Sequence, residues 1–358
     1  MTKSKMTQDE VNIGLDRLRL ANINVLGVDF NRFIANGGEF NLGEGVEVVD
    51  MKTSEVIQIN DFYINVEGFA EGDDNSTLQL QLYKLKGRND YTFTLGVNAP
   101  KLYATTNIDN VSNSKQIEHI PQMIQRHLAK VGVYVDLEQA TVSYFEVNYN
   151  ICDDSFINTF KMINECWKSD NNKVFIVDSK DGYESLKLKL PTREIKLYNK
   201  VKQLQDTFQF VVEDDVARVE VSTSHKTTIK SLFGDDKLNT LCQNIDRIQD
   251  FYKKVVNDNI KKPYMVYKQM LLDYMVEQLE NGVKPYELQY RLSITNRLVD
   301  LKLFAEAIKM YYKKVGKKSP NNVIKSNLKR LHNVDENLYN KLQNNCDKIE
   351  KFFDDIGI

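Results

Sequence analysis

Apolar and polar residues alternate along much of the first two thirds of the chain. The alternation is clearest over residues 78–82, 91–97 and 145–149, and a period of two is typical of strands with one face in a core. Over residues 114–130 the apolar positions instead recur every three or four residues, which predicts a helix, and a second helix is predicted over 154–167. Strands interrupted by such helices predict an α+β fold, built on a largely antiparallel sheet with flanking helices.

After Gly234 the alternation stops and a helical period takes over. The predicted ends of the helices are marked by proline, glycine and serine, at Pro263, Asn281-Gly282, Pro285 and Ser319-Pro320. We expect Ser319 to cap the helix that Pro320 starts. The sequence therefore predicts two domains, a catalytic nuclease domain over residues 1–240 and an all-α, basic DNA-binding or accessory domain over residues 241–358.

Three of the predicted strands place apolar side chains on one face and polar side chains on the other. The polar set comprises two carboxylates, a phenol, basic groups and two amides, at Glu146, Asn148, Asn150, Lys196, Tyr198, Arg218 and Glu220. If the strands are neighbours, these groups converge on one exposed sheet face. Such a set suits phosphodiester transfer, in which carboxylates hold a divalent ion and a tyrosine oxygen attacks the phosphate. The alternative is a half-exposed sheet without chemistry, because such sheets show the same pattern.

A metal site in this chain would be built from oxygen ligands. The sequence contains no His-hydrophobic-His pair, and His119 and His127 are expected at a helix surface. The four cysteines form no CxxC pair, so we expect free buried thiols rather than zinc ligands. Oxygen ligands favour Mg²⁺ or Mn²⁺. Asp16 is a further candidate ligand, although a position in line with Leu18 and Leu20 could equally mark only the start of a strand.

Charge is distributed unevenly along the chain. The net charge is −2, yet residues 251–334 hold 14 Lys and 3 Arg against 3 Asp and 4 Glu, an excess of ten positive charges that leaves −12 for the remainder. This asymmetry is expected when one part of a protein binds phosphates. On the helix after Ser319, the exposed surface would present Lys325, Lys329 and Arg330 to DNA. The alternative is a scaffold bundle with solubilising charges.

Short motifs along the chain resemble those of rolling-circle replication initiators. LYNK at 197–200 and ARVEV at 217–221 are similar to the Tyr-x-Lys and Arg-hydrophobic-Glu motifs of the plasmid Rep trans type. SYFEVNYN at 143–150 is similar to the acidic strand that precedes these motifs. The filamentous-phage gene II replication proteins show the same order, which LDRL at 15–18 and NAPKLYATTNIDN at 98–110 also fit.

The resemblance implies roles for individual residues. Tyr198 would be the nucleophile and Lys200 would contact the scissile phosphate. Glu146 and Glu220 would hold or support the metal ion. Apart from the resemblance, we expect the basic side chains of the same polar faces and their neighbours to contact DNA, namely Lys196, Lys202 and Arg218. We also expect Lys200 or Lys202 to favour the phenolate of Tyr198.

The implied activity is that of a metal-dependent, site-specific DNA nickase and strand transferase. It would leave a 5′-phosphotyrosine link and a free 3′-OH primer at a replication origin. The implied partner is origin DNA, duplex and single-stranded, while a helicase of the host or element and a second copy of the chain remain open. Gly96 and Gln203 stand where the family pattern has acidic residues, which keeps a non-catalytic origin-binding or regulatory protein as the alternative. An interaction protein that binds through its sheet face is a third reading, opposed by the basic region.

Composition adds two expectations. A hydrophobic content of 42% is ample for a core, so the chain is expected to fold. No apolar run is long enough to span a bilayer, and the first residues lack the apolar segment of a secretory signal. We therefore expect a cytoplasmic protein with no membrane partner.

Overall fold

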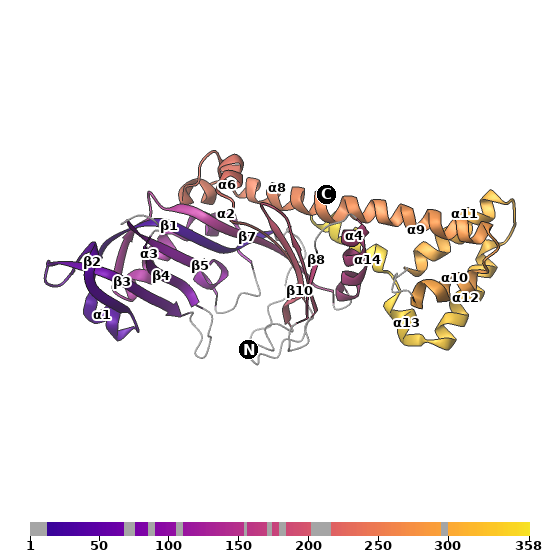
Figure 1. Ribbon diagram of the computed structural model, residues 1–358, viewed down its shortest axis with the longest axis horizontal. Helices are drawn as coiled ribbons and strands as arrows, with labels where there is room; N and C mark the ends of the chain where they lie inside the picture. Colours follow the sequence, from indigo (N-terminus) through magenta and orange to yellow (C-terminus); the bar gives the residue numbers. More distant parts are fainter. Residues whose placement is uncertain are drawn as a thin grey trace.

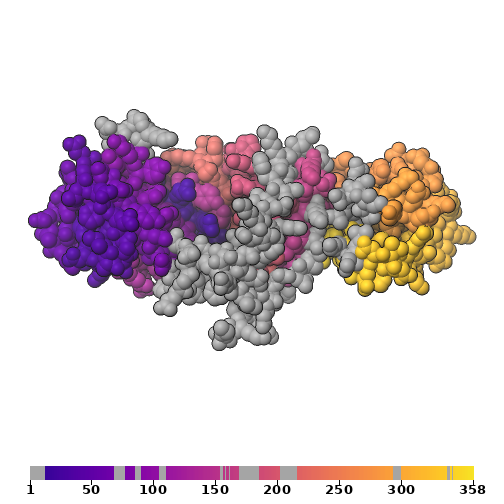
Figure 2. Space-filling model, turned by 60° about the horizontal axis from the view of Figure 1, so that its bottom comes forward, coloured from indigo at the N-terminus to yellow at the C-terminus, as the bar shows by residue number. Residues whose placement is uncertain are grey.

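The computed structural model describes residues 13–67, 76–84, 90–104, 110–153, 156–169, 174–178, 184–201, 216–294 and 300–358. The molecule is elongated, with a sheet-rich half at one end and a helical half at the other (Figure 1). Figure 2 shows the same separation on the surface, from indigo at one end to orange and yellow at the other. The predicted α+β fold followed by a mostly helical region is confirmed.

The strands in the described part of the chain form one antiparallel sheet. In spatial order they are β2 (Glu39–Val49), β3 (Val56–Glu67), β4 (Ser76–Lys84), β5 (Tyr91–Asn98), β1 (Gly14–Val28), β7 (Thr141–Ile151), β11 (Ala217–Thr223), β10 (Glu194–Asn199), β9 (Glu184–Lys189) and β8 (Val174–Asp178). A short strand, β6 (Val133–Asp136), pairs with the second half of β1. The centre of the sheet therefore joins strands that are far apart in the sequence.

Short helices accompany the sheet. They are α1 (Phe30–Ala35), α2 (Ser114–Glu118), α3 (Ile120–Lys130), α4 (Phe160–Ser169), α6 (Lys226–Phe233) and α7 (Leu238–Cys242), with 3₁₀ turns η1 (Pro100–Leu102) and η2 (Phe156–Thr159). The helix predicted over 114–130 is present, but it divides at His119, two residues before Pro121, whose nitrogen cannot donate a hydrogen bond. The helix predicted over 154–167 begins as η2 and continues as α4.

The apolar face of β7 is covered by helices, including one from the predicted second domain. The Phe145 ring lies 5.8 Å from the ring of Phe233 in α6 and 5.3 Å from that of Phe251 in α8 (Ile245–Val256). The Tyr252 hydroxyl donates a hydrogen bond to the Val219 carbonyl oxygen of β11 at 3.2 Å. Each buried aromatic side chain contributes roughly 1.5–3 kcal/mol. Helix α8 is thus an integral part of the core beneath the sheet.

A long helical rod leads from the sheet to the helical half (Figure 1). It consists of α8, a π-helical turn η3 (Asn257–Lys261) and α9 (Lys262–Glu280). The Trp167 indole nitrogen in α4 donates a hydrogen bond to the Asn259 carbonyl oxygen at 2.6 Å, inside the π turn. A π turn leaves backbone groups out of α-helical register, and here the side chain of a neighbouring helix contacts one of them.

The helical half contains α10 (Pro285–Ile294), α11 (Leu301–Lys314), α12 (Pro320–Val334) and α13 (Glu336–Lys341). The predicted helix starts are confirmed, but the predicted cap is wrong, because Ser319 has a φ of 66° and makes no side-chain cap hydrogen bond to the described residues. The last helix, α14 (Asn345–Asp355), returns toward the sheet, where the Phe352 ring lies 5.9 Å from the Tyr149 ring and 5.8 Å from the Phe156 ring. The end of the chain therefore packs beside the sheet.

Several smaller expectations are also tested by the fold. His127, expected at the surface, is buried, and burial lowers its pKa. The thiols are free as expected, but Cys152 is exposed while the other three cysteines are buried. Among the helices that the structure describes, none is long and apolar enough to cross a membrane.

Candidate active site

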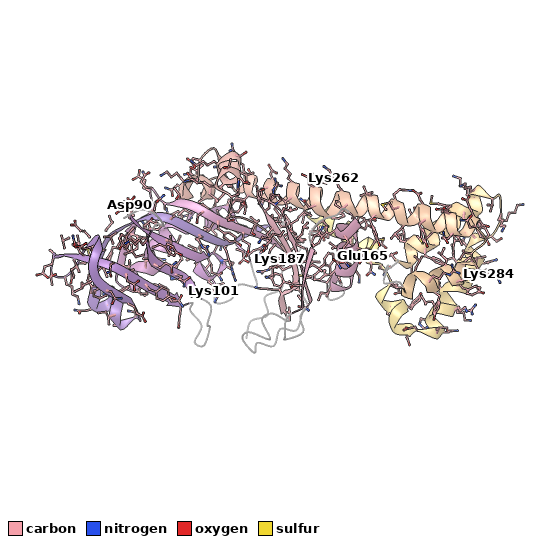
Figure 3. The ribbon with its side chains drawn as sticks, viewed as in Figure 1. Asp90, Lys101, Glu165, Lys187, Lys262 and Lys284 are labelled. Atoms are coloured by element: carbon pink, nitrogen blue, oxygen red, sulfur yellow. The ribbon has the colours of Figure 1, made fainter. Side chains whose placement is uncertain are left out.

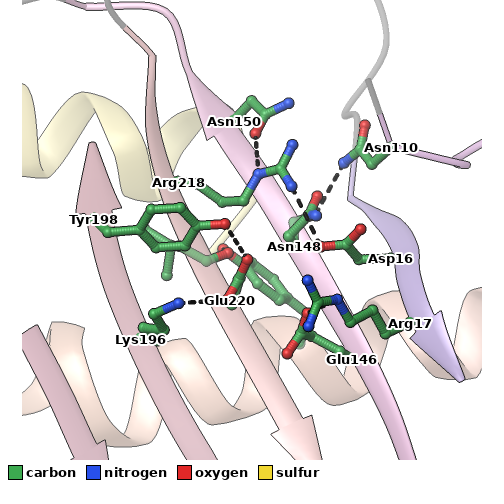
Figure 4. Close-up of polar contacts among 12 residues, drawn as sticks. Asp16, Arg17, Asn110, Glu146, Asn148, Asn150, Lys196, Tyr198, Arg218 and Glu220 are labelled. Atoms are coloured by element: carbon green, nitrogen blue, oxygen red, sulfur yellow. Dashed lines mark hydrogen bonds and ion pairs between the residues drawn. The ribbon is translucent and has the colours of Figure 1, made fainter. Parts of the chain in front are cut away.

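The register of four adjacent strands brings the predicted polar residues together (Figure 4). Across β10 and β11, Tyr198 lies opposite Arg218 and Lys196 lies opposite Glu220. Across β11 and β7, Glu220 lies opposite Asn148. The convergence predicted from the alternation of the strands is therefore present, and β1 adds residues from the start of the chain.

Three carboxylates form the centre of this cluster. Ligand oxygens of Asp16, Glu146 and Glu220 all lie within 4.8 Å of one another, and all three side chains are buried. Burial is the main cause that raises the pKa of Glu146, and the negative charges of Glu220 and Asp16 raise it further, to about 8. For Asp16 burial acts in the same direction, but the cations Arg218 and Lys200 outweigh it and lower its pKa. The three carboxylates thus resist being charged together, and a divalent cation between them would offset their repulsion and favour their ionised forms.

Tyr198 points into the cluster from β10. Its side chain is 1% exposed and its hydroxyl donates a hydrogen bond to a Glu220 oxygen. The ammonium groups of Lys196 and Lys200 lie 4.2 and 5.7 Å from the centre of its ring. Burial and the charge of Glu220 raise the pKa of Tyr198 well above its usual value, which favours the neutral phenol. Chemistry at this oxygen therefore requires a proton acceptor, and Glu220 is already hydrogen-bonded to it.

Arg218 holds the cluster together from the side of β11. Its side chain is 0% exposed; Nε donates to Asn150 Oδ1 at 2.8 Å and Nη1 donates to Asp16 Oδ2 at 3.2 Å. This ion pair links residues that are 202 positions apart in the sequence. A buried charge is tolerated only when it is paired and hydrogen-bonded, and Arg218 meets that condition.

A second tyrosine contacts the same carboxylates. The Tyr144 hydroxyl donates a hydrogen bond to Glu146 Oε2 at 2.6 Å. On the opposite side, Arg17 Nε lies 4.0 Å from Glu146 Oε1. Neither residue was predicted to belong to the site, yet Tyr144 lies two positions before Glu146 and therefore on the same strand face.

The predicted site face is buried rather than exposed, which corrects the expectation from the alternation pattern. Glu146, Lys200, Arg218 and Glu220 are all buried. Alternation in the sequence indicates that a strand has one apolar and one polar face, but it does not indicate whether other parts of the chain pack over the polar face. A direct contact between DNA and Arg218 or Lys200 would therefore require the cluster to open.

The predicted basic residues are placed as follows. Lys200 lies inside the cluster, where burial and the nearby Arg218 lower its pKa to about 7. Lys196 Nζ lies 3.9 Å from Glu220 Oε2, at the edge of the cluster. Lys202, like Gln203, lies outside the described residues.

The third carboxylate comes from β1, where the sequence pattern was ambiguous. Gly96, where an acidic residue was expected, pairs with Arg19 across β5 and β1. Asp16 of β1 occupies the cluster instead. Its signal in the sequence was weak, because a single aspartate before alternating leucines is equally typical of a strand start.

The residues present fit a divalent cation. Asp16 Oδ1 and the Asn148 amide are buried, and these atoms have no hydrogen-bond partner of good geometry in the described residues, although the Asn148 amide lies near enough to Asp16 to help lower its pKa. Asn148 is 0% exposed and lies opposite Glu220, so its amide oxygen is a natural fourth oxygen beside the three carboxylates. Buried polar atoms are normally paired, and a cation with oxygen preference would satisfy the oxygens Asp16 Oδ1 and Asn148 Oδ1 together.

The predicted DNA-binding residues of α12 lie at the far end of the molecule. Lys325, Lys329 and Arg330 are exposed, while Ile324 is buried and Val323 is partly buried. Figure 3 shows one further cation of this half, Lys284 near the start of α10, whereas Lys262 at the start of α9 lies near the middle of the molecule. The cations of α12 thus lie on an accessible surface well separated from the carboxylate cluster (Figure 1).

Comparisons with known proteins are sparse. No family model matches the chain, and no curated protein matches it. A solved structure described as a rolling circle replication initiator protein from Geobacillus stearothermophilus is similar over 70% of this chain and 85% of that chain, with 11% sequence identity and a TM-score of 0.35.

Proposed function

We propose that this chain is a metal-dependent DNA nickase and strand transferase that initiates rolling-circle replication. The observation that carries the proposal is the position of Tyr198, whose hydroxyl is hydrogen-bonded to Glu220 within a buried cluster of three carboxylates. The order of the motifs around Tyr198 and Glu220 supports the same function. The second candidate, a non-catalytic DNA-binding protein, is favoured by the burial of Tyr198, which keeps the phenol from solvent.

In the proposed reaction the Tyr198 oxygen attacks a phosphodiester of one DNA strand. A bond forms between the phenolic oxygen and phosphorus, and the bond from phosphorus to the 3′ oxygen breaks. The phenolic proton passes to Glu220, and the leaving 3′ oxygen takes up a proton from water to become the free 3′-OH. The 5′ end remains attached to Tyr198, and the reverse attack by a 3′-OH rejoins DNA.

A Mg²⁺ or Mn²⁺ ion held by Asp16, Glu146 and Glu220, with the Asn148 amide, would stabilise negative charge on the phosphate and on the leaving oxygen. The protein itself orients the reacting groups. Arg218 holds Asp16 in place, and Lys196 lies over the Tyr198 ring, where its positive charge favours the phenolate. Because Tyr198 is almost fully buried, the scissile strand reaches it only when the residues covering the cluster move.

Two DNA substrates test the proposal, and neither requires the cleavage site to be chosen in advance. The first is supercoiled DNA that carries the chain's own gene and flanking sequence, and the second is a pool of single-stranded oligonucleotides of random sequence. With Mg²⁺ or Mn²⁺ we expect open circles from the first and an SDS-resistant protein–DNA adduct from both, and sequencing of the attached DNA gives the cleavage site. With EDTA both products should disappear. Folded protein that forms neither product with either ion would refute the enzymatic function and leave the DNA-binding alternative.

We further propose that residues 241–358 supply the DNA-docking surface. A truncation near residue 250 cannot test this, because it removes Phe251 and Tyr252 from the core under the sheet. Instead we expect Lys325→Glu, Lys329→Glu and Arg330→Glu, combined in the full chain, to weaken duplex binding and to flatten its salt dependence. The log–log slope should fall by about 0.9 for each phosphate that the variant no longer neutralises.

The measurement is a mobility shift at several salt concentrations. A matched control reverses three exposed cations of the sheet half, Lys115, Arg126 and Lys130, which changes the net charge equally. If the control variant lowers the slope as much as the α12 variant, the docking surface is not on α12.

A further inference from the structure

A groove of about 320 Å³ lies between α10 and α12 at the helical end of the molecule. Tyr286 and Tyr290 line it from α10, and Arg330 and Leu331 line it from α12. The tyrosines are 40% and 62% exposed, and they lie one turn apart on the same face of α10. Large aromatic side chains that remain exposed inside a concave surface are typical of binding sites.

The polar groups of the groove point to a flat, anionic ligand. The Arg330 guanidinium carbon lies 4.4 Å from the centre of the Tyr286 ring, which places a cation and an aromatic plane side by side. The groove also contains one acidic residue, Glu287. Its negative charge is balanced by Arg291, whose Nη2 lies 2.5 Å from Glu287 Oε1. Asn327 adds an amide to the lining. The groove thus combines ring faces, an amide and a positive charge.

The surroundings of the groove carry further positive charge. Lys325 and Lys329 are exposed on α12, one turn apart, and Lys329 adjoins Arg330. The wider segment, residues 251–334, has an excess of ten positive charges, since it contains 14 Lys and 3 Arg but only 3 Asp and 4 Glu. Charge complementarity therefore favours a polyanion over an apolar partner helix or a second copy of this basic surface.

We propose that the α10–α12 groove binds an unpaired base of single-stranded DNA, with the sugar-phosphate backbone beside Lys325 and Lys329. In duplex DNA the faces of each base are covered by its stacked neighbours, so only an unpaired base can stack on Tyr290 or on the Tyr286–Arg330 pair. The proposal rests on the proposed function, because a nicked strand with a free 3′-OH can be extended while the old strand is displaced. It adds that the helical half holds such a strand away from the catalytic cluster.

The test measures binding of two fluorescein-labelled probes by anisotropy in EDTA, so that cleavage does not contribute. The probes are a 15-nucleotide oligothymidine and a blunt hairpin duplex. We expect Tyr290→Ala to weaken binding of oligothymidine roughly 10-fold or more and to leave duplex binding within about 2-fold. Tyr290→Phe, which keeps the ring, should bind like the unmodified protein. The matched control is Tyr83→Ala, because Tyr83 is 54% exposed on β4 in the sheet half.

The remaining outcomes overturn the inference. Unchanged oligothymidine binding by Tyr290→Ala, or equal losses for both probes, would mean that the groove does not recognise an unpaired base. A change of oligomeric state in Tyr290→Ala, seen by light scattering, would mean that a second copy covers the groove. The proposed function fails separately, because its test is the covalent adduct at Tyr198, which Tyr290→Ala leaves in place.

Discussion

Tyr198→Phe is expected to abolish DNA nicking and covalent attachment, with a loss on the order of 10⁴-fold or more, because the variant lacks only the attacking oxygen. The ring stays in its buried position, so the fold should be retained. The lost hydrogen bond to Glu220 should lower the free energy of unfolding by only about 1 kcal/mol. The measurement is the yield of SDS-resistant adduct from single-stranded DNA in Mn²⁺.

Tyr144→Phe is the matched control, since it removes a phenolic oxygen that is hydrogen-bonded to a carboxylate of the same cluster. This variant should still form the adduct. The opposite result, adduct formation by Tyr198→Phe and none by Tyr144→Phe, would assign the nucleophile to Tyr144. Peptide mapping of the adduct distinguishes the two tyrosines directly.

Glu146→Ala and Glu220→Ala are each expected to slow nicking severely, by roughly 100-fold or more, because each removes an oxygen ligand from the proposed ion. The same variants should lose the stabilisation that Mn²⁺ gives to the folded protein. Any ion that binds the folded state alone raises the unfolding temperature as its concentration rises. Thermal unfolding with increasing Mn²⁺ therefore reads out ion binding independently of activity, and a large excess of Mn²⁺ should partly restore one of the variants.

Glu194→Ala controls for the loss of a carboxylate from the same sheet. Glu194 lies on β10, and its Oε1 lies 2.8 Å from Lys187 Nζ, outside the three-carboxylate cluster. This variant should keep both nicking and the response to Mn²⁺. Full activity of both cluster variants, or of the unmodified protein in excess chelator, would eliminate the proposed metal site.

The individual strands and helices could be predicted from the sequence because their signals are local. The pleat of a strand repeats every two residues, so Glu146, Asn148 and Asn150 had to share one face of β7. The same reasoning placed Tyr198 with Lys196 on β10, and Arg218 with Glu220 on β11. In the helical half, proline and the three-to-four residue period were sufficient to locate α9, α10 and α12.

Only the tertiary structure decided which of these faces meet and which are buried. Pairing between β1 and β7 brings Asp16 to Glu146 across about 130 residues of chain, and no periodic pattern contains that information. Burial of the polar face, which leaves Tyr198 and Arg218 with almost no exposed surface, is likewise not visible in the alternation of any one strand. The placement of α8 and α14 against the sheet has the same origin. Periodicity is set by the geometry of each residue and its immediate neighbours, whereas strand order and burial result from contacts that form only when the whole chain packs.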